Sequence, residues 1–266
     1  MSRFREAHPR ARRVYGQNLL ADPGAVRRVA DAAGLGPGDL VVEVGAGRGR
    51  LTAELLRRAG HVVAYEVDPG LAAAIPRRDG LTVRTGDFLA APAPAEAFAV
   101  VGNIPYALTA AVVAWCLDAP ALTAATLLTQ LEYARKRSGD YGRWSRLTIE
   151  TWPEVEWRLA GRVPRQAFRP VPSVDGGILR LTRRPEALVP PQSLQRYRRM
   201  VHLGFSGVGG SLQASLGRRH PPDRVAAAFR ALRLRPGTPV GLVWPEQWLT
   251  LFRLLDSSAY RTRTLR

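Results

Sequence analysis

The chain has 266 residues, of which 46% are hydrophobic, enough to bury a core in one large domain or in a domain with a smaller companion. Its single cysteine excludes a disulfide framework within the chain and zinc or iron–sulfur sites rich in cysteine, and it favours a reducing cytoplasm. The net charge of +17 favours a polyanionic partner, and nucleic acid is preferred to an anionic membrane because no basic amphipathic helix stands out.

The first part of the chain alternates between apolar runs and helical patterns. Residues 1–17 are rich in arginine and are predicted to form a flexible basic arm, without the apolar run of a signal peptide. Strands are predicted at 39–44, 61–68, 81–87, 97–103 and 125–131. Helices are predicted at 22–34, 50–60, 71–78 and 107–120. This alternation predicts an α/β fold with a doubly wound, mostly parallel sheet.

The pattern changes after about residue 147. Residues 147–159 and 176–184 are predicted as strands of an antiparallel hairpin at the edge of the sheet. Residues 188–266 carry periodic leucines and are predicted to be helical. We therefore expect a catalytic domain over 1–184 and a smaller, basic helical domain over 185–266.

A glycine-rich turn follows the first buried strand. The residues "GAGRG" at 45–49 have the spacing GxGxG, which differs from the GxGxxG dinucleotide fingerprint. Glycine permits a tight turn and lets a ligand approach the main chain. Such a turn is weak evidence by itself, because many turns from strand to helix contain glycine.

Acidic residues end the next two predicted strands. Glu66 lies 21 residues after Gly45, where an acid can accept both hydroxyls of a ribose, and Asp87 can accept an adenine amino group. Either acid alone is more simply explained as a solvated carboxylate at a strand end. Together with the glycine turn, at the carboxyl ends of consecutive strands, they predict an adenosine ligand that has no pyrophosphate.

The tetrapeptide Asn103-Ile104-Pro105-Tyr106 ends the next predicted strand, on the same edge of the sheet. The Asn103 oxygen and a neighbouring main-chain carbonyl can accept hydrogen bonds from one exocyclic amino group and aim its lone pair. Proline fixes the turn, and the tyrosine ring offers a face for a purine. The bland alternative is a turn with a satisfied asparagine and a core tyrosine, which this position in the strand order disfavours.

Several motifs resemble the ribosomal RNA adenine N6-methyltransferases, in the order found in that family. They are "GQNLLAD" at 16–22, "EVGAGRGRLT" at 43–52, "YEVD" at 65–68, "TGDF" at 85–88, "NIPY" at 103–106 and "FRPVPSVDGGILRL" at 168–181. The resemblance implies the class I S-adenosylmethionine-dependent fold over residues 10–183. Residues 134–159 are most similar to the Erm branch of actinomycetes, which methylates an adenine of 23S rRNA and confers resistance to macrolides, lincosamides and streptogramin B.

The resemblance also implies roles for individual residues. S-adenosylmethionine would be bound by Asn18, Leu20, Gly45, Ala46, Gly47, Glu66, Val67, Asp87, Phe88 and Asn103. The catalytic set would be Asn103, Ile104, Pro105, Tyr106 and Phe168, in which Tyr106 stacks on a flipped adenine and Phe168 covers its other face. Leu19 and Ala107 depart from residues frequent in the family, and Ala107 mildly favours the Erm branch.

Clusters of basic residues are predicted to bind RNA. They comprise Arg12, Arg13, Arg135, Lys136, Arg137, Arg143 and Arg146, along with the basic tail. The four histidines are scattered, so no metal site is predicted. The expected partner is 23S rRNA, free or in an immature large subunit, and the expected enzyme is a cytoplasmic monomer that does not bind membranes.

Alternatives remain at this stage. One is dimethylation of small-subunit rRNA in ribosome assembly, and a DNA adenine methyltransferase is disfavoured by Ile104, where those enzymes usually have proline. Another is a non-catalytic RNA-binding protein on the same fold, which the intact glycine turn and Asn103 disfavour. The sequence leaves open whether one or two methyl groups are added.

Overall fold

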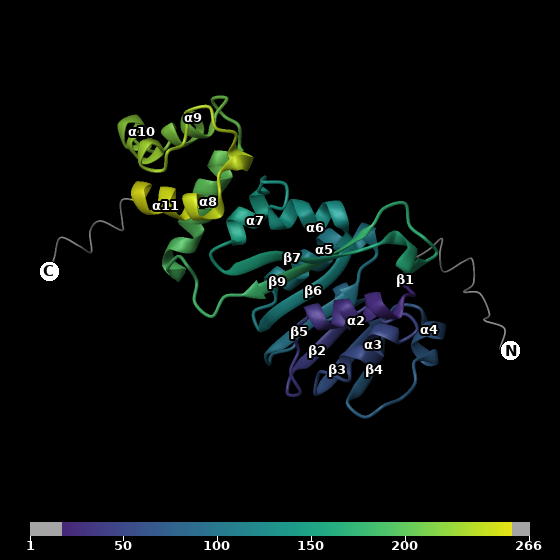
Figure 1. The fold of residues 1–266 in the computed structure, drawn as a ribbon. Helices are drawn as coiled ribbons and strands as arrows, with labels where there is room; N and C mark the ends of the chain where they lie inside the picture. The colour runs from purple at the N-terminus through teal and green to yellow at the C-terminus, as the bar shows by residue number, and fades with distance from the viewer. Residues whose placement is uncertain (1–17, 257–266) are drawn as a thin grey trace. The chain divides into compact units, whose positions relative to one another are not determined.

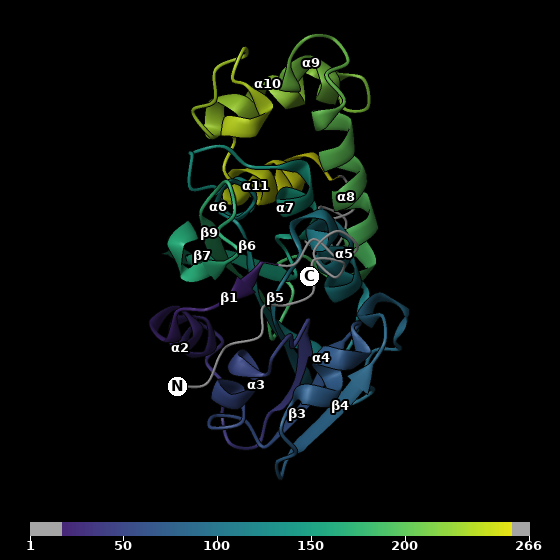
Figure 2. The same cartoon turned by 90° about the vertical axis from the view of Figure 1, so that its right-hand side faces the viewer.

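The computed structural model describes residues 18–256. The basic arm predicted at 1–17, with Arg12 and Arg13, lies outside the described residues. The described residues divide into a sheet unit, residues 18–134 and 158–182, and a helical unit, residues 135–157 and 183–256. No helix within 18–256 is both long and apolar enough to cross a membrane. Figures 1 and 2 show the elements of each unit from two directions.

A seven-stranded sheet forms the centre of the sheet unit, in the order β4-β3-β2-β5-β6-β9-β7. Its strands are β2 (Leu40–Val44), β3 (His61–Glu66), β4 (Leu81–Thr85), β5 (Phe98–Asn103), β6 (Leu122–Gln130), β7 (Val155–Val163) and β9 (Gly176–Arg183). The five neighbouring strands β4, β3, β2, β5 and β6 pair in parallel, whereas β9 runs antiparallel to β6. The predicted doubly wound, mostly parallel sheet is therefore confirmed, and β7 lies at its edge.

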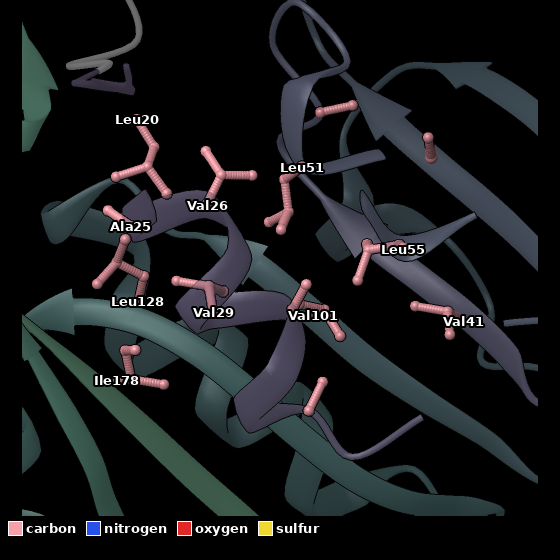
Figure 3. Packing of buried hydrophobic residues seen from close by; sticks show 14 of the residues in the cluster. Leu20, Ala25, Val26, Val29, Val41, Leu51, Leu55, Val101, Leu128 and Ile178 are labelled. Carbon is pink, nitrogen blue, oxygen red and sulfur yellow. The ribbon is translucent and has the colours of Figure 1, made fainter. Parts of the chain in front are cut away.

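Helices cover both faces of this sheet. They are α2 (Pro23–Ala32), α3 (Arg50–Leu55), α4 (Pro69–Ala74) and α5 (Thr109–Asp118). Helix α2 begins as predicted, because the Asp22 carboxylate accepts a hydrogen bond from Ala25 N at 2.6 Å. The side chains between α2, α3 and the sheet form one apolar core (Figure 3). Helix α5 covers the opposite face, where its Trp115 ring lies 6.1 Å from Phe98.

Residues 146–151 differ from the predicted strand. They form helix α7 (Arg146–Thr151), in which the Ser145 hydroxyl accepts a hydrogen bond from Thr148 N at 3.3 Å. Strand β7 begins only at Val155, and helix α6 (Leu131–Ser138), which was not predicted, precedes this region. The helix is favoured over the strand because Ser145 caps its N-terminus and because Ile149 is buried in the core of the helical unit.

Four further helices complete the helical unit: α8 (Pro191–Phe205), α9 (Leu212–Gly217), α10 (Pro222–Ala231) and α11 (Pro245–Leu255). Their core surrounds Trp248, which is fully buried. A Cβ atom on Gly204 would lie 2.4 Å from the Trp248 ring, so glycine allows α8 to approach α11 closely. Trp144 and Ile149 belong to the same core, so residues 135–157 group with residues 183–256. This grouping differs from the single boundary expected between residues 184 and 185, which places residues 135–157 in the catalytic domain.

Candidate active site

The glycine turn connects β2 to α3. Gly45, Gly47 and Gly49 have φ angles of +73°, +57° and +74°, in the left-handed region that favours glycine. The main-chain nitrogens of Gly45 and Ala46 both donate to Tyr65 O at 3.0 Å, which ties the turn to the end of β3. A Cβ atom on Gly45 would lie 3.7 Å from Asn103 O. The turn therefore lies against the ends of two neighbouring strands.

The Glu66 carboxylate holds the end of β3 to this turn. Its Oε2 accepts a hydrogen bond from Gly47 N at 2.7 Å, and its Oε1 accepts one from Asp68 N at 3.0 Å. The side chain is only 1% exposed. Hydrogen bonds from the main chain to a carboxylate are strong. Glu66 is therefore oriented before any ligand is bound.

Asn103 ends β5 and is oriented in the same manner. Its Nδ2 donates to Asn18 O at 2.7 Å, which fixes the plane of the amide and leaves Oδ1 as an acceptor. The next residue, Ile104, is buried and donates its main-chain N–H to Leu128 O at 3.0 Å. The tetrapeptide is thus anchored to the sheet, and its asparagine is tied to the segment that precedes α2.

Tyr106 follows at the start of a short 3₁₀ helix, η2 (Tyr106–Leu108). Its side chain is half-buried, and its burial, together with the nearby Asp175 carboxylate, raises the pKa of the phenol. The ring is therefore neutral at physiological pH. A neutral ring that lines a cavity suits stacking on a purine.

These groups line one cavity. Its walls are formed by Asn18, Leu19, Gly45, Gly47, Glu66, Asn103, Ile104, Pro105 and Tyr106. The residues come from the ends of β2, β3 and β5 and from the segment before α2. The structure therefore brings together the glycine turn, the predicted ribose acid and the Asn-Ile-Pro-Tyr motif, as expected for the carboxyl edge of a parallel sheet.

Two predicted residues lie in the core instead of lining this cavity. Leu20, of strand β1 (Leu19–Leu20), pairs with Phe168, of strand β8 (Phe168–Arg169), and both side chains are buried. Leu19, which sequence reasoning missed, lines the cavity in place of Leu20. The Phe168 ring lies against Gly176, where a Cβ atom would be 3.1 Å away. In this structure Phe168 is part of the apolar core, and its predicted contact with a flipped adenine stays a prediction.

Asp87 and Phe88 also lie away from the cavity walls. Asp87 is exposed, and its Oδ1 accepts a hydrogen bond from Leu89 N at 2.9 Å. The Phe88 ring is buried 4.3 Å from Trp115 and 5.8 Å from Tyr65. It lines a second cavity of about 380 Å³, alongside Trp115. Ala46 and Val67 adjoin lining residues in sequence and are not among the walls themselves.

Glu43 is a buried acid that sequence reasoning did not single out. It lies in β2, two residues before the glycine turn, and is fully buried. Burial, together with the nearby Glu66 carboxylate, raises the pKa of its carboxyl to about 7, and the neighbouring Thr52 opposes this shift. The signal in the sequence was an acid inside an otherwise apolar run, "LVVEV".

The predicted RNA-binding residues of 135–146 lie in the helical unit and have different surroundings. Arg135 forms an ion pair with Asp140 at 2.9 Å, and Arg146 pairs with Glu150 at 3.5 Å. Arg137 donates to the Ser145 hydroxyl at 2.8 Å. Lys136 and Arg143 are exposed. Among residues 18–256, no group of His, Cys, Asp and Glu side chains is arranged to hold a metal ion.

Comparisons with known proteins extend over both units. A model of the family described as ribosomal RNA adenine dimethylase matches residues 8–257. An rRNA adenine N-6-methyltransferase of Streptomyces fradiae is 56% identical over 252 residues, covering 92% of this chain and 79% of the relative. A mycinamicin-resistance protein of Micromonospora griseorubida is 35% identical, covering 91% of this chain and 78% of the relative. The crystal structure of the 23S rRNA methyltransferase ErmE matches with a TM-score of 0.86 and 49% identity, covering 90% of this chain and 100% of that chain.

Proposed function

The chain belongs to the ribosomal RNA adenine dimethylase family, and we propose that it methylates N6 of one adenine in 23S rRNA with S-adenosylmethionine as the methyl donor. The modification would confer resistance to macrolides, lincosamides and streptogramin B. The observation that carries the proposal is the single cavity that unites the glycine turn, Glu66, Asn103 and Tyr106. The names of its relatives support the choice of 23S rRNA and of resistance.

The residues that line the cavity support an adenosyl cofactor. Gly47 lines the cavity, and a Cβ atom there would lie 3.0 Å from Leu19 Cδ2, so glycine lets the turn pack closely against Leu19 in the cavity wall. The Glu66 carboxylate lines the cavity, and carboxylate oxygens are the acceptors that suit ribose hydroxyls. We assign the adenine to Asp87 and to the neighbouring Phe88 and Val67 main chain.

When bound, S-adenosylmethionine supplies an electrophilic methyl group. Asn103 Oδ1 and a main-chain carbonyl of the motif would accept the two N–H groups of adenine N6, which directs its lone pair at that methyl carbon. Tyr106 would stack on the flipped base and hold its plane. N6 would take the methyl group as the bond from that carbon to sulfur breaks, and the proton would then pass from N6 to water. The protein's contribution is orientation, so no strong base is required.

The experiment is methylation by purified Asn103→Ala. We expect at least a 100-fold loss of methyl transfer to 23S rRNA with S-adenosylmethionine affinity reduced less than threefold, because an orienting contact is removed. Leu108→Ala, an exposed change five residues away, is the matched control and should retain wild-type activity. Transfer by Asn103→Ala at the wild-type rate would refute the mechanism.

The finer parts of the proposal concern the substrate's state. We propose that the enzyme is a cytoplasmic monomer that acts on 23S rRNA, free or in an immature large subunit, because a flipped adenine must be accessible. The helical unit would supply RNA contacts, through Lys136, Arg143 and its other arginines. Mapping methylated adenines in both rRNAs by mass spectrometry decides between this target and small-subunit rRNA. The same spectra count the methyl groups.

A further inference from the structure

Two half-exposed aromatic rings lie on the helical unit. The exposed fractions are 55% for Tyr141 and 53% for Trp244, the two largest among exposed apolar and aromatic side chains of the described residues. Both belong to segments that meet at Trp144, a ring that is 9% exposed. The Trp144 and Trp244 ring centroids are 5.8 Å apart, and Trp144 N donates to Gly241 O at 2.7 Å. Trp144 therefore supports the segment that carries Trp244.

The loop that carries Tyr141 folds over the same tryptophan. A Cβ atom on Gly139 would lie 2.5 Å from the Trp144 ring, so this loop can pack there only with glycine. Gly142 N donates to Gly139 O at 2.8 Å and closes the turn around residues 140 and 141. Tyr141 and Trp244 therefore project from two segments that share one buried support.

Both rings are held in place by their neighbours. The Arg135 guanidinium lies 5.1 Å from the Tyr141 ring centroid and donates to its hydroxyl at 3.3 Å. The Trp244 ring packs against the Trp144 ring, and its main-chain N–H donates to Gln247 Oε1 at 2.9 Å, which fixes the backbone that carries the ring. An aromatic ring fixed in advance loses little conformational entropy when it binds a flat partner. Neither ring belongs to the hydrophobic core of the helical unit, so the core does not explain why these rings are there.

The charge around the rings indicates what they would bind. The described residues of the helical unit include 17 basic and 8 acidic side chains. Exposed Lys136 and Arg143 flank Tyr141 in sequence, and exposed Arg233 and Arg235 precede the Trp244 segment. Aromatic faces among fixed positive charges are typical of sites for single-stranded nucleic acid, in which bases stack and phosphates pair. The same excess of positive charge opposes a second copy of this chain.

We propose that Tyr141 and Trp244 form a stacking platform for unpaired bases of the substrate RNA. The platform rests on the proposed function in one respect, namely that RNA is the substrate. It adds a class of contact, stacking on aromatic rings of the helical unit, to the arginine contacts predicted from the sequence. Because every base has a stacking face, the platform would select unpaired RNA over duplex RNA without selecting a sequence.

The test measures binding of a fluorescein-labelled single-stranded RNA oligonucleotide and of a duplex of equal length. Trp244→Ala and Tyr141→Ala should each weaken single-stranded binding about tenfold and duplex binding less than twofold. Trp244→Phe and Tyr141→Phe keep a ring and should remain within threefold of wild type. Val208→Ala, an exposed apolar change in the same unit, is the matched control and should bind as wild type.

Three outcomes would overturn the platform. The first is unchanged single-stranded binding by the double alanine variant. The second is equal loss of single-stranded and duplex binding, which indicates misfolding. The third is a shift from dimer to monomer by light scattering, which indicates self-association. Binding is measured without methyl transfer, so the two proposals fail separately. A platform that binds RNA in an enzyme that methylates no rRNA would refute only the proposed function.

Discussion

The sheet unit and the helical unit present their functional groups in contrasting ways. In the sheet unit, Glu66 and Asn103 are already hydrogen-bonded to main-chain atoms around one cavity. In the helical unit, Tyr141 and Trp244 are open to solvent on a basic surface. The contrast teaches that group transfer requires convergent, preorganised atoms, whereas capture of a long polyanion requires exposed faces and charge.

The largest effect should come from removing the centre of the helical unit. Trp248→Ala should lower the free energy of unfolding of that unit by about 3–5 kcal/mol, because Trp248 is fully buried and closely packed against Gly204. The two units have separate hydrophobic cores. If they also unfold independently, the affinity of Trp248→Ala for S-adenosylmethionine should change less than threefold. Urea unfolding and calorimetric titration measure the two quantities. Simultaneous loss of cofactor binding would contradict the separation, and Trp244→Ala is the control for loss of an exposed tryptophan.

Glu43 should make the stability of the sheet unit depend on pH. Its folded pKa of about 7 lies above the ordinary value of 4.5, so the stability present below pH 4.5 is lost as the pH rises to about 7. A shift of this size corresponds to about 3 kcal/mol. Glu43→Gln cannot ionise, so its free energy of unfolding relative to wild type should rise by about 2.5 kcal/mol between pH 5 and pH 8.

Urea unfolding at the two pH values measures this difference. Glu54→Gln is the matched control, since hydrogen bonds from Arg58 and Arg57 lower the pKa of Glu54 and its effect is therefore complete above pH 5. A difference between Glu43→Gln and wild type that stays constant over this range would show that Glu43 is ionised in the folded protein.

Local patterns predicted most of the sheet unit and the centre of its site. The turn at 45–49, Glu66 and Asn103 follow apolar runs directly, so their place at one edge of the sheet follows from strand order alone. Leu19 was missed because the facing of strand β1 depends on its pairing with β8, far along the chain. A strand of two residues is too short to show an alternating pattern, so its sequence does not indicate which side chain faces the cavity.

Packing between distant segments explains the other differences. The Phe88 ring packs on Trp115 from α5, and the predicted place of Phe88 at the cofactor stays a prediction. Residues 146–151 have a pattern that also suits a strand, and burial of Ile149 with Tyr197 and Trp248 selects the helix. The Tyr197 hydroxyl donates to Ile149 O at 2.9 Å, a contact across 48 residues. Single-sequence periodicity contains no information about such partners.

Glu66 and Asp87, the two acids at or just after the ends of neighbouring strands of the sheet unit, should differ in their effect on cofactor affinity. Glu66→Gln places an amide beside Gly47 N and Asp68 N, so at least one N–H donor loses its acceptor. We expect S-adenosylmethionine affinity to fall about 30-fold, or about 2 kcal/mol. Asp87→Asn keeps an oxygen for Leu89 N at an exposed position and should change affinity less than threefold. Calorimetric titration compares the variants, and equal losses would show that the buried acid has no special role.

The smallest effects concern single charges of the helical unit. Lys136→Ala and Arg143→Ala each remove an exposed cation and should weaken single-stranded RNA binding by less than about 1 kcal/mol. If each contacts a phosphate, the slope of log affinity against log salt should become shallower by about 0.7 per variant. Arg57→Ala, whose guanidinium pairs with Glu54 in the sheet unit, is the matched control and should keep the wild-type slope. Every phosphate contact releases counterions, so a residue that contacts a phosphate must contribute to the slope. An unchanged slope for both test variants would therefore show that Lys136 and Arg143 contact no phosphate, and stacking would remain as the means by which residues 135–146 bind RNA.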